Sequence, residues 1–232
     1  MLEKVKAGSP LREDDDSQLN WLRVATSVNA TEVTARKNHM KLIILDRDGV
    51  INHDRDDFVK SADEFVPIHG SIDAIARLHK AGFTVVVATN QSGLARGKFD
   101  LDDLEAMHEK LTQLVEEQGA ELSAIFYCPH SPEDNCKCRK PLPGMIDAIE
   151  AEFNISAEGF YFVGDSLRDL QAAITKGCKP ILVKTGNGEK TTAQLADVNL
   201  QTHVPKVALE QVHLVDDLAS AADFIIANDS GN

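Results

Sequence analysis

The chain has 232 residues, 43% of them hydrophobic and 26% charged, a composition that predicts one globular domain with a sizeable core. A net charge of -13 argues against nucleic-acid or anionic-membrane partners, since both need a positive surface field. No apolar stretch approaches the roughly 20 residues of a membrane span, and the N-terminus lacks a basic start followed by an apolar segment. We therefore expect a soluble, cytoplasmic protein, and we expect it to be a monomer.

Residues 1–39 differ from the rest of the chain. They carry an acidic EDDD run and little periodic apolar pattern, which is typical of a flexible extension. Met40 lies two residues before the first apolar run, so an alternative is that the folded domain starts there. We expect an N-terminal extension over 1–39 and one folded domain over 40–228.

The first apolar run ends abruptly in two aspartates, in the sequence LIILDRDGVIN over residues 42–52. Four consecutive apolar residues followed by charge and glycine predict a buried parallel strand whose carboxyl end opens into a site. In an extended segment Asp46 and Asp48 would project to the same side, about 6.6 Å apart. That spacing suits one attacking carboxylate and one that moves a proton. A solvated loop with a turn glycine, or a fragment of a calcium-binding loop, also fits this motif alone.

The later elements alternate between apolar runs of strand length and amphipathic helices. This alternation predicts an α/β fold with a parallel sheet. The expected strands are 42–45, 83–88, 124–127, 160–163 and 180–183, with a possible edge strand at 212–215, and the expected helices begin near residues 71, 101, 144, 167 and 218.

Polar groups follow the predicted strands in chain order: the aspartate pair, TNQS over residues 89–92, Arg139 and Lys140, and GDSLRD over residues 164–169. The carboxyl ends of parallel strands meet at one edge of a sheet, so we expect these groups in one cleft. Carboxylates gathered there repel one another unless a cation lies among them, and Mg²⁺ fits that place. Lys140, Thr89 and Asn90 would then donate to phosphoryl oxygens. Asp165 taken alone also fits as a helix cap.

Three of the four cysteines lie beside a histidine in CPHSPEDNCKCRKP, residues 128–141. Two ligand pairs at i and i+2, with five residues between the pairs, form a Cys₃His set that suits tetrahedral Zn²⁺: Cys128, His130, Cys136 and Cys138. Because all four positions are filled, we expect a structural metal that brings Arg139 and Lys140 to the cleft. The alternative, a loop of free thiols, would be an oxidation liability. Cys178 stands apart and is expected to be a small buried residue.

The four motifs in this order resemble the haloacid dehalogenase superfamily of phosphotransferases, over residues 41–227. The resemblance implies a three-layer Rossmann-like parallel sheet. It also implies that Asp46 is the nucleophile that forms an aspartyl-phosphate, and that Asp48 protonates the leaving group and then activates water. Thr89 and Lys140 would stabilise the transferring phosphoryl group.

The same resemblance implies the metal ligands. Asp46, the backbone carbonyl of Asp48, and Asp165 would bind Mg²⁺. Asp169 would support the metal and Lys140 from behind. Sheet, helix and zinc loop fill the gaps between motifs, so no separate cap domain fits, and selectivity is left to the stretch 54–58, to LARGKF at residues 94–99 and to the zinc loop.

Within the superfamily, TNQSGLARGKF, CPH, CxCRKP and GDS resemble the D-glycero-D-manno-heptose-1,7-bisphosphate 7-phosphatases, which serve lipopolysaccharide and surface-glycan synthesis. This implies a small phosphorylated sugar as substrate, contacted by Asn90, Gln91, Ser92 and Arg139, with the arginine at the second phosphate or at sugar hydroxyls. Ser166 departs from the lysine that members often carry there, which bears on anomer preference and substrate identity. The alternatives are histidinol-phosphate phosphatase or another small-molecule phosphomonoesterase, and a non-catalytic phosphate-binding module.

Overall fold

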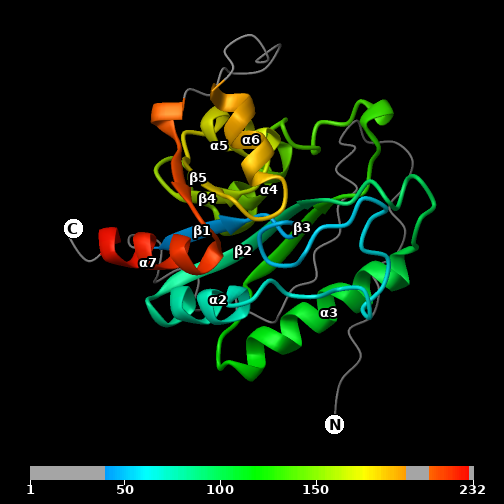
Figure 1. Ribbon diagram of the computed structural model, residues 1–232, viewed down its shortest axis with the longest axis horizontal. Helices are drawn as coiled ribbons and strands as arrows, with labels where there is room; N and C mark the ends of the chain where they lie inside the picture. The colour runs from blue at the N-terminus through cyan, green and yellow to red at the C-terminus, as the bar shows by residue number, and fades with distance from the viewer. Residues whose placement is uncertain (1–39, 197–208, 230–232) are drawn as a thin grey trace.

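The protein is described by a computed structural model that covers residues 40–196 and 209–229 (Figure 1). The predicted extension over 1–39 lies outside the described residues. Within them, none of the helices is both long enough and apolar enough to cross a bilayer.

Six parallel strands form one sheet, in the order β3-β2-β1-β4-β5-β6. Their bounds are β1 Lys41–Leu45, β2 Phe83–Asn90, β3 Ala124–Cys128, β4 Tyr161–Gly164, β5 Lys179–Val183 and β6 His213–Val215. The parallel sheet predicted from the sequence is confirmed, including its edge strand at 212–215. Strands β2 and β3 lie in succession on one side of β1, and strands β4, β5 and β6 lie in succession on its other side. The order therefore reverses beside the carboxyl end of β1, where open α/β sheets bind ligands.

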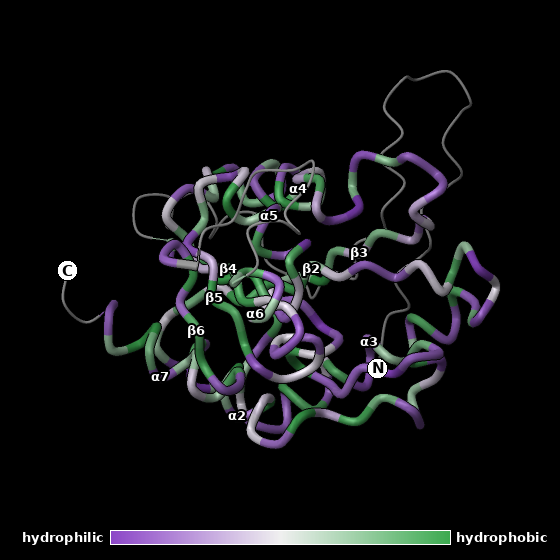
Figure 2. Tube along the Cα trace, turned by 45° about the horizontal axis from the view of Figure 1, so that its top comes forward, coloured by the Kyte–Doolittle hydropathy of each residue, from purple (hydrophilic) through white to green (hydrophobic). Residues whose placement is uncertain are grey.

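Helices cover both faces of the sheet and make three layers (Figure 1). On one face lie α2 Ser71–Lys80, α3 Leu101–Glu117 and α7 Leu218–Asp229, and on the other lie α4 Gly144–Phe153, α5 Leu167–Thr175 and α6 Gly188–Ala196. Alternate strand residues supply the two cores: Ile43 and Leu45 face the first set of helices, while Leu42 and Ile44 face the second. Figure 2 shows apolar segments gathered in the middle of the molecule and hydrophilic segments around the outside.

Helix α3 is the longest helix described, and its ends follow from its sequence. Asp100 caps its N-terminus, accepting a hydrogen bond from the backbone N–H of Asp103, whose side chain accepts one from the backbone of Asp100. The apolar residues Leu104, Met107, Leu111 and Val115 recur at helical spacing and are buried against the sheet. A histidine, His108, is buried on the same face, which the apolar pattern did not indicate.

The structure departs from the predicted elements at several places. Strand β2 runs two residues further than expected, so Thr89 and Asn90 belong to the strand and pair with Tyr127 and Cys128 of β3. Helix α6 was not expected, because its sequence offers only Leu195 as a buried large apolar residue. Two short 3₁₀ helices, Pro132–Asp134 and Leu209–Gln211, complete the described elements.

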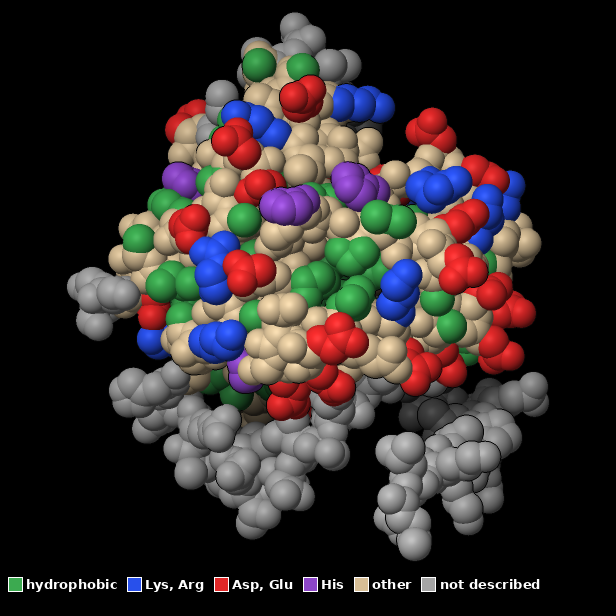
Figure 3. All heavy atoms as spheres, turned by 60° about the horizontal axis from the view of Figure 1, so that its bottom comes forward, with side chains coloured by type: hydrophobic (Ala, Val, Ile, Leu, Met, Phe, Trp, Pro, Cys, Tyr) green, Lys and Arg blue, Asp and Glu red, His purple; other side chains and the backbone are tan. Residues whose placement is uncertain are grey.

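The surface has no broad basic area on the face drawn in Figure 3. Acidic side chains are spread over that face, and Lys and Arg side chains lie singly between them. This distribution agrees with the net charge of -13.

Candidate active site

A cleft of about 200 Å³ lies at the carboxyl ends of β1, β2 and β4. The predicted catalytic, substrate-binding and magnesium-binding residues all line it: Asp46, Asp48, Thr89, Asn90, Gln91, Ser92, Arg139, Lys140, Asp165 and Asp169. The loop between β1 and α2, the end of β2, the zinc loop after β3 and the start of α5 each contribute part of this set. The predicted convergence of the strand ends is therefore found in the structure.

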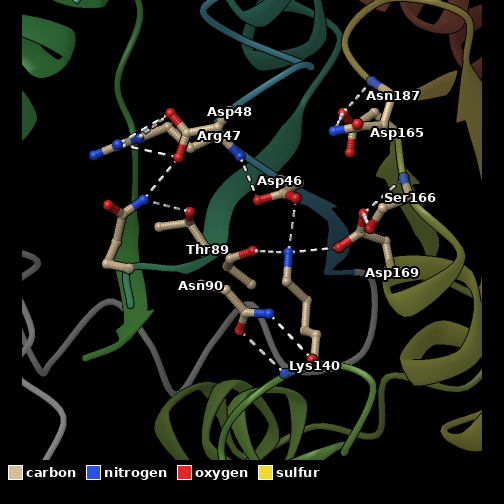
Figure 4. A network of polar contacts seen from close by, with 12 residues as sticks. Asp46, Arg47, Asp48, Thr89, Asn90, Lys140, Asp165, Ser166, Asp169 and Asn187 are labelled. Carbon is tan, nitrogen blue, oxygen red and sulfur yellow. Dashed lines mark hydrogen bonds and ion pairs between the residues drawn. The ribbon is translucent and has the colours of Figure 1, made fainter. Parts of the chain in front are cut away.

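Lys140 lies at the bottom of the cleft, and its side chain is 2% exposed. Its Nζ atom lies 2.9 Å from Oδ2 of Asp46, 2.6 Å from Oδ1 of Asp169 and 2.7 Å from the carbonyl oxygen of Ala88 (Figure 4). Burial opposes the charged amine, but the Asp169 and Asp46 carboxylates outweigh burial and raise the pKa of Lys140. Lys140 is thus a fixed cation directly beside the predicted nucleophile.

The carboxylates around Lys140 carry more negative charge than one lysine can balance. Ligand oxygens of Asp46, Asp165 and Asp169 lie within 4.8 Å of one another. Burial, and then the Asp169 charge, raise the pKa of Asp46 well above its ordinary value, and the same two causes raise the pKa of Asp165 to about 7. Such a set of oxygens is one that a divalent cation stabilises, and it fits Mg²⁺.

Asp165 is held by a loop that the sequence had not singled out. Its Oδ2 atom accepts from the backbone N–H of Asn187 at 2.7 Å and from the Asn187 side chain at 3.2 Å. A Cβ added at Gly49 or Gly186 would come within 2.1 or 2.2 Å of the same oxygen, and both glycines have positive φ. Two glycines and one amide therefore keep a space around this carboxylate. The GNG sequence after β5 is the only sequence signal for Asn187.

The chain bends at Arg47 and turns directly after Asp48, where the backbone N–H groups of residues 50–52 point to the carbonyl oxygen of Arg47. Both aspartates nevertheless line the cleft. The Asp48 carboxylate accepts hydrogen bonds from Arg47, from Nδ2 of Asn52 at 2.9 Å and from Nε2 of Gln91 at 2.8 Å. Burial opposes its charge, but the Arg47 guanidinium and these hydrogen bonds outweigh burial and lower the pKa of Asp48.

Two amide side chains predicted to contact substrate have protein partners. Gln91 is buried and its Nε2 atom donates both to Asp48 and to Oγ1 of Thr89, each at 2.8 Å. The Asn90 side chain is bonded to the backbone of Lys140. Gln91 thus contacts two predicted catalytic side chains and Asn90 contacts the backbone of a third predicted catalytic residue, while Ser92 and Arg139 also line the cleft.

The predicted zinc ligands form one cluster. Neighbouring Sγ and Nδ1 atoms of Cys128, His130, Cys136 and Cys138 lie 3.3 to 3.7 Å apart. A tetrahedral Zn²⁺ with ligands at about 2.3 Å would set its sulfurs about 3.8 Å apart, so the donor set and its size fit zinc. Cys178 is buried elsewhere, as expected, and donates to the carbonyl oxygen of Ala157.

The two basic residues of the LARGKF motif, Arg96 and Lys98, do not reach the cleft. Lys98 pairs with Asp57 at 3.1 Å and Arg96 with Glu133 at 3.6 Å, so these ion pairs join the three expected selectivity loops to one another. Neither Lys98 nor Arg96 lines the cleft, whereas Arg139 and Arg168 do.

Arg139 and Arg168 lie close enough to repel each other. Burial, and then the charge of Arg168, lower the pKa of Arg139. Among the described residues, neither guanidinium has a carboxylate within ion-pairing distance. Two cations that face a cleft without carboxylate partners suit an anionic ligand.

Comparison with known proteins identifies the family. A model described as haloacid dehalogenase-like hydrolase matches residues 32–175, more than half of the chain. The chain belongs to this family. A second hydrolase model of the same type matches residues 137–221. The resemblance to this superfamily, drawn from the four motifs, is confirmed.

Within this haloacid dehalogenase-like family, the chain is similar to relatives of one kind. It is 54% identical over 187 residues to D-glycero-beta-D-manno-heptose-1,7-bisphosphate 7-phosphatase from Pseudomonas putida, covering 81% of this chain and 100% of the relative. It is 59% identical over 155 residues to the Neisseria meningitidis serogroup B protein of that name, covering 67% and 83%. The solved structure of the B. bronchiseptica D,D-heptose 1.7-bisphosphate phosphatase, complexed with magnesium and phosphate, matches with TM-score 0.74 and 51% identity over 82% of this chain and 99% of that chain.

Proposed function

We propose that this protein is a Mg²⁺-dependent phosphatase that removes the 7-phosphate of D-glycero-D-manno-heptose 1,7-bisphosphate. The observation that carries the proposal is the cleft itself: Asp46 lies against Lys140 and the carboxylate cluster, with Asp48 held beside them. The substrate follows from the relatives, which share more than half of their residues with this chain over most or all of their own length.

The proposed reaction has two steps, both carried by the aspartate pair. An Asp46 oxygen bonds to phosphorus while the bond to the sugar oxygen breaks, and Asp48 gives that oxygen its proton. Asp48 then takes a proton from water, whose oxygen displaces Asp46 from phosphorus. In the substrate-free site Asp48 is ionised, and the negative charge of an incoming phosphate favours its protonated form.

The other groups stabilise charge on the transferring phosphoryl group. Asp46, the backbone carbonyl of Asp48, and Asp165 would hold Mg²⁺, which neutralises phosphoryl oxygens when bound. Lys140 supplies a second positive charge, held in place by Asp169. The hydroxyl of Thr89, oriented by Gln91, is free to donate to a phosphoryl oxygen.

The second phosphate would bind at the rim. Arg139 directly follows Cys138 in the sequence, and Arg168 lies on the first turn of α5. Both arginines line the cleft. Together they would supply the charge that a lysine at the position of Ser166 supplies in other members. The zinc cluster would hold Arg139 and Lys140 at a constant distance from the sheet, because Cys128 belongs to β3 and Cys138 directly precedes Arg139.

We further propose that the site works in a single chain and in a reducing compartment such as the cytoplasm. The cleft of one chain already contains every predicted catalytic and magnesium-binding residue. The zinc cluster requires three reduced thiols, which the cytoplasm maintains.

The test is phosphate release with Mg²⁺ from both anomers of heptose 1,7-bisphosphate, beside histidinol phosphate and fructose 1,6-bisphosphate. We expect one heptose anomer to be preferred, and Asp46→Asn to abolish its turnover while the circular dichroism spectrum stays unchanged. Preference for histidinol phosphate, or equal weak activity on all four, would overturn the sugar assignment. Retained turnover in Asp46→Asn would overturn the nucleophile.

A further inference from the structure

Arg47 stands between the two predicted catalytic aspartates and lines the cleft, but its guanidinium points away from the phosphoryl site. Its side chain is only 1% exposed, and its guanidinium lies beyond the Asp48 carboxylate as seen from Lys140 (Figure 4). Its Nη2 atom lies 3.0 Å from Oδ1 and 3.1 Å from Oδ2 of Asp48, and its Nε atom 3.3 Å from Oδ1. The planar fork therefore binds both carboxylate oxygens and defines the plane of the Asp48 carboxylate.

The remaining edge of the guanidinium is held by a residue of another element. Nη1 of Arg47 lies 3.3 Å from Nε2 of His108, which belongs to α3, 61 residues further along the chain. Because arginine only donates, Nε2 must accept, and the imidazole is neutral with its proton on Nδ1. The guanidinium also lies over the Phe65 ring, with 5.9 Å between its central carbon and the ring centroid.

His108 is an unfavourable residue for its location unless it serves Arg47. It is 1% exposed on the apolar face of α3, between the buried residues Leu104 and Leu111. Its Nδ1 atom has no hydrogen-bond partner among the described residues, which is costly for a buried donor. A leucine would suit the core better, so the property that histidine adds here is the acceptor for Nη1 of Arg47.

We propose that Arg47 and His108 are a positioning pair that fixes the orientation of the Asp48 carboxylate, so that Asp48 exchanges its proton with the leaving group and with water. The inference rests on the proposed function, in which Asp48 is the acid and base. Neither residue touches substrate in this account. Their side chains contact Asp48 and do not contact Asp46, Lys140 or Asp165, which have other partners. The one contact between Arg47 and Asp46 is a hydrogen bond of 2.7 Å from the Arg47 backbone N–H to Oδ1 of Asp46, which side-chain substitutions at residues 47 and 108 retain.

The physical reason is that proton transfer depends steeply on geometry. Without the acceptor on His108, a buried Nη1 loses its partner, and the guanidinium relaxes away from its present plane. The Asp48 carboxylate then keeps only Asn52 and Gln91, each of which binds a single oxygen. Two contacts to single oxygens leave the Asp48 carboxylate free to rotate about its Cβ–Cγ bond, whereas the two-oxygen contact with the Arg47 guanidinium prevents this rotation.

The test uses esters that differ in their need for an acid. An alkyl phosphate such as the preferred sugar phosphate needs a proton on its leaving oxygen, whereas p-nitrophenyl phosphate releases a stable phenolate without one. The purified full-length chain with Mg²⁺ is compared as wild type, His108→Leu, which removes the acceptor, and His108→Gln, which retains an acceptor. Asp48→Asn is measured as the reference for complete loss of the acid.

We expect His108→Leu to lower kcat for the alkyl phosphate about tenfold, with KM unchanged, as partial loss of acid–base catalysis. The pre-steady-state burst of nitrophenolate should keep its wild-type rate, since that step needs no acid. His108→Gln should restore most of the alkyl activity. Equal losses in the alkyl rate and in the burst rate, or a His108→Leu enzyme as active as wild type, would overturn the proposal.

Two further measurements separate the possible failures. If His108→Leu does not fold, Arg47→Lys keeps the positive charge without the planar fork. An unchanged ratio of kcat for the alkyl phosphate to the nitrophenolate burst rate in that variant overturns the proposal. If Asp48→Asn retains full alkyl activity, the assignment of Asp48 as the acid fails and the pair fails with it. If the heptose bisphosphate is a poor substrate, the comparison is made on the best alkyl phosphate, so the sugar assignment can fail while the pair stands.

Discussion

The side-chain amide of Asn90 binds both backbone polar groups of Lys140. The Lys140 N–H donates to Oδ1 of Asn90 at 3.1 Å, and Nδ2 of Asn90 donates to the Lys140 carbonyl oxygen at 3.1 Å. Asn90 is the last residue of β2 and pairs in register with Cys128 of β3. The sheet therefore holds the backbone of Lys140 directly through Asn90, and the predicted zinc loop, which carries Lys140, is a second restraint on it.

Asn90→Ala should damage both stability and turnover. The change leaves the Lys140 backbone N–H and carbonyl without these partners, which costs about 1–3 kcal/mol of unfolding free energy. It also lets the Nζ atom move from Asp46, so we expect kcat to fall about tenfold. Urea unfolding and steady-state kinetics check this, with Asn228→Ala on the exposed side of α7 as the control. Wild-type kcat in Asn90→Ala would show that the zinc loop positions Lys140 alone.

Zinc removal should loosen the loop that carries Arg139 and Lys140. We expect about one zinc per chain by elemental analysis, and a lower melting temperature and lower turnover after chelation. Cys136→Ser should lose the metal, while Cys178→Ser, which changes a buried cysteine outside the cluster, should keep it. An unchanged melting curve and rate after verified metal loss would exclude a structural zinc.

Magnesium should stabilise the fold through the carboxylate cluster. In the absence of metal, the negative charges of Asp46 and Asp165 repel each other, so Mg²⁺ should raise the melting temperature. At a hundredfold excess of Mg²⁺ over its dissociation constant, the free energy of unfolding should rise by about 2.7 kcal/mol. Asp165→Asn should abolish most of this increase. Asp102→Asn, an exposed change on α3, should leave it intact. An equal magnesium effect in both variants would place the ion elsewhere.

The stability of the protein should depend on pH through His108. Burial, and then the Arg47 charge, lower the pKa of His108 to about 3, from an ordinary value near 6.5. Because the pKa of His108 is lower in the folded state than in the unfolded state, neutral His108 contributes stability above pH 6.5, and this contribution is lost as the pH falls toward 3. Between pH 7.5 and 5, the wild type should therefore lose about 2 kcal/mol more than His108→Gln. Parallel losses in urea unfolding at the two pH values would mean that His108 is charged or solvated in the fold.

Removal of residues 1–39 should leave the active site unchanged. Among the residues that the structure describes, every one that lines the cleft is residue 46 or later, and the Pseudomonas putida relative matches along its whole length within 81% of this chain. We expect a chain that starts at Met40 to keep kcat and KM within about twofold. A large loss in kcat would place the extension in the site or in an assembly contact.

Much of the site could be predicted because its polar residues form short motifs of neighbouring residues in the sequence. An apolar run that ends in Asp-x-Asp predicts a buried strand that delivers carboxylates to the edge of a parallel sheet, and the polar groups after the later strands favoured this interpretation over a solvated or calcium-binding loop. The same reasoning placed the ends of β2 and β4 to within two residues, and ligand spacing alone located the Cys₃His cluster. These features depend on residues that are close together in the chain, which is why pattern and period were enough.

Tertiary structure decided which side chain serves which. Residues 47 and 108 are 61 positions apart, and no periodicity indicates that a histidine on the apolar face of α3 meets an arginine after β1. Asn187 holds Asp165 from a loop that only the position of β5 brings near. Likewise, Arg168 lines the cleft while Lys98 pairs with Asp57 outside it. Hydrogen bonds and ion pairs between elements depend on packing and register, and the sequence taken in order contains neither.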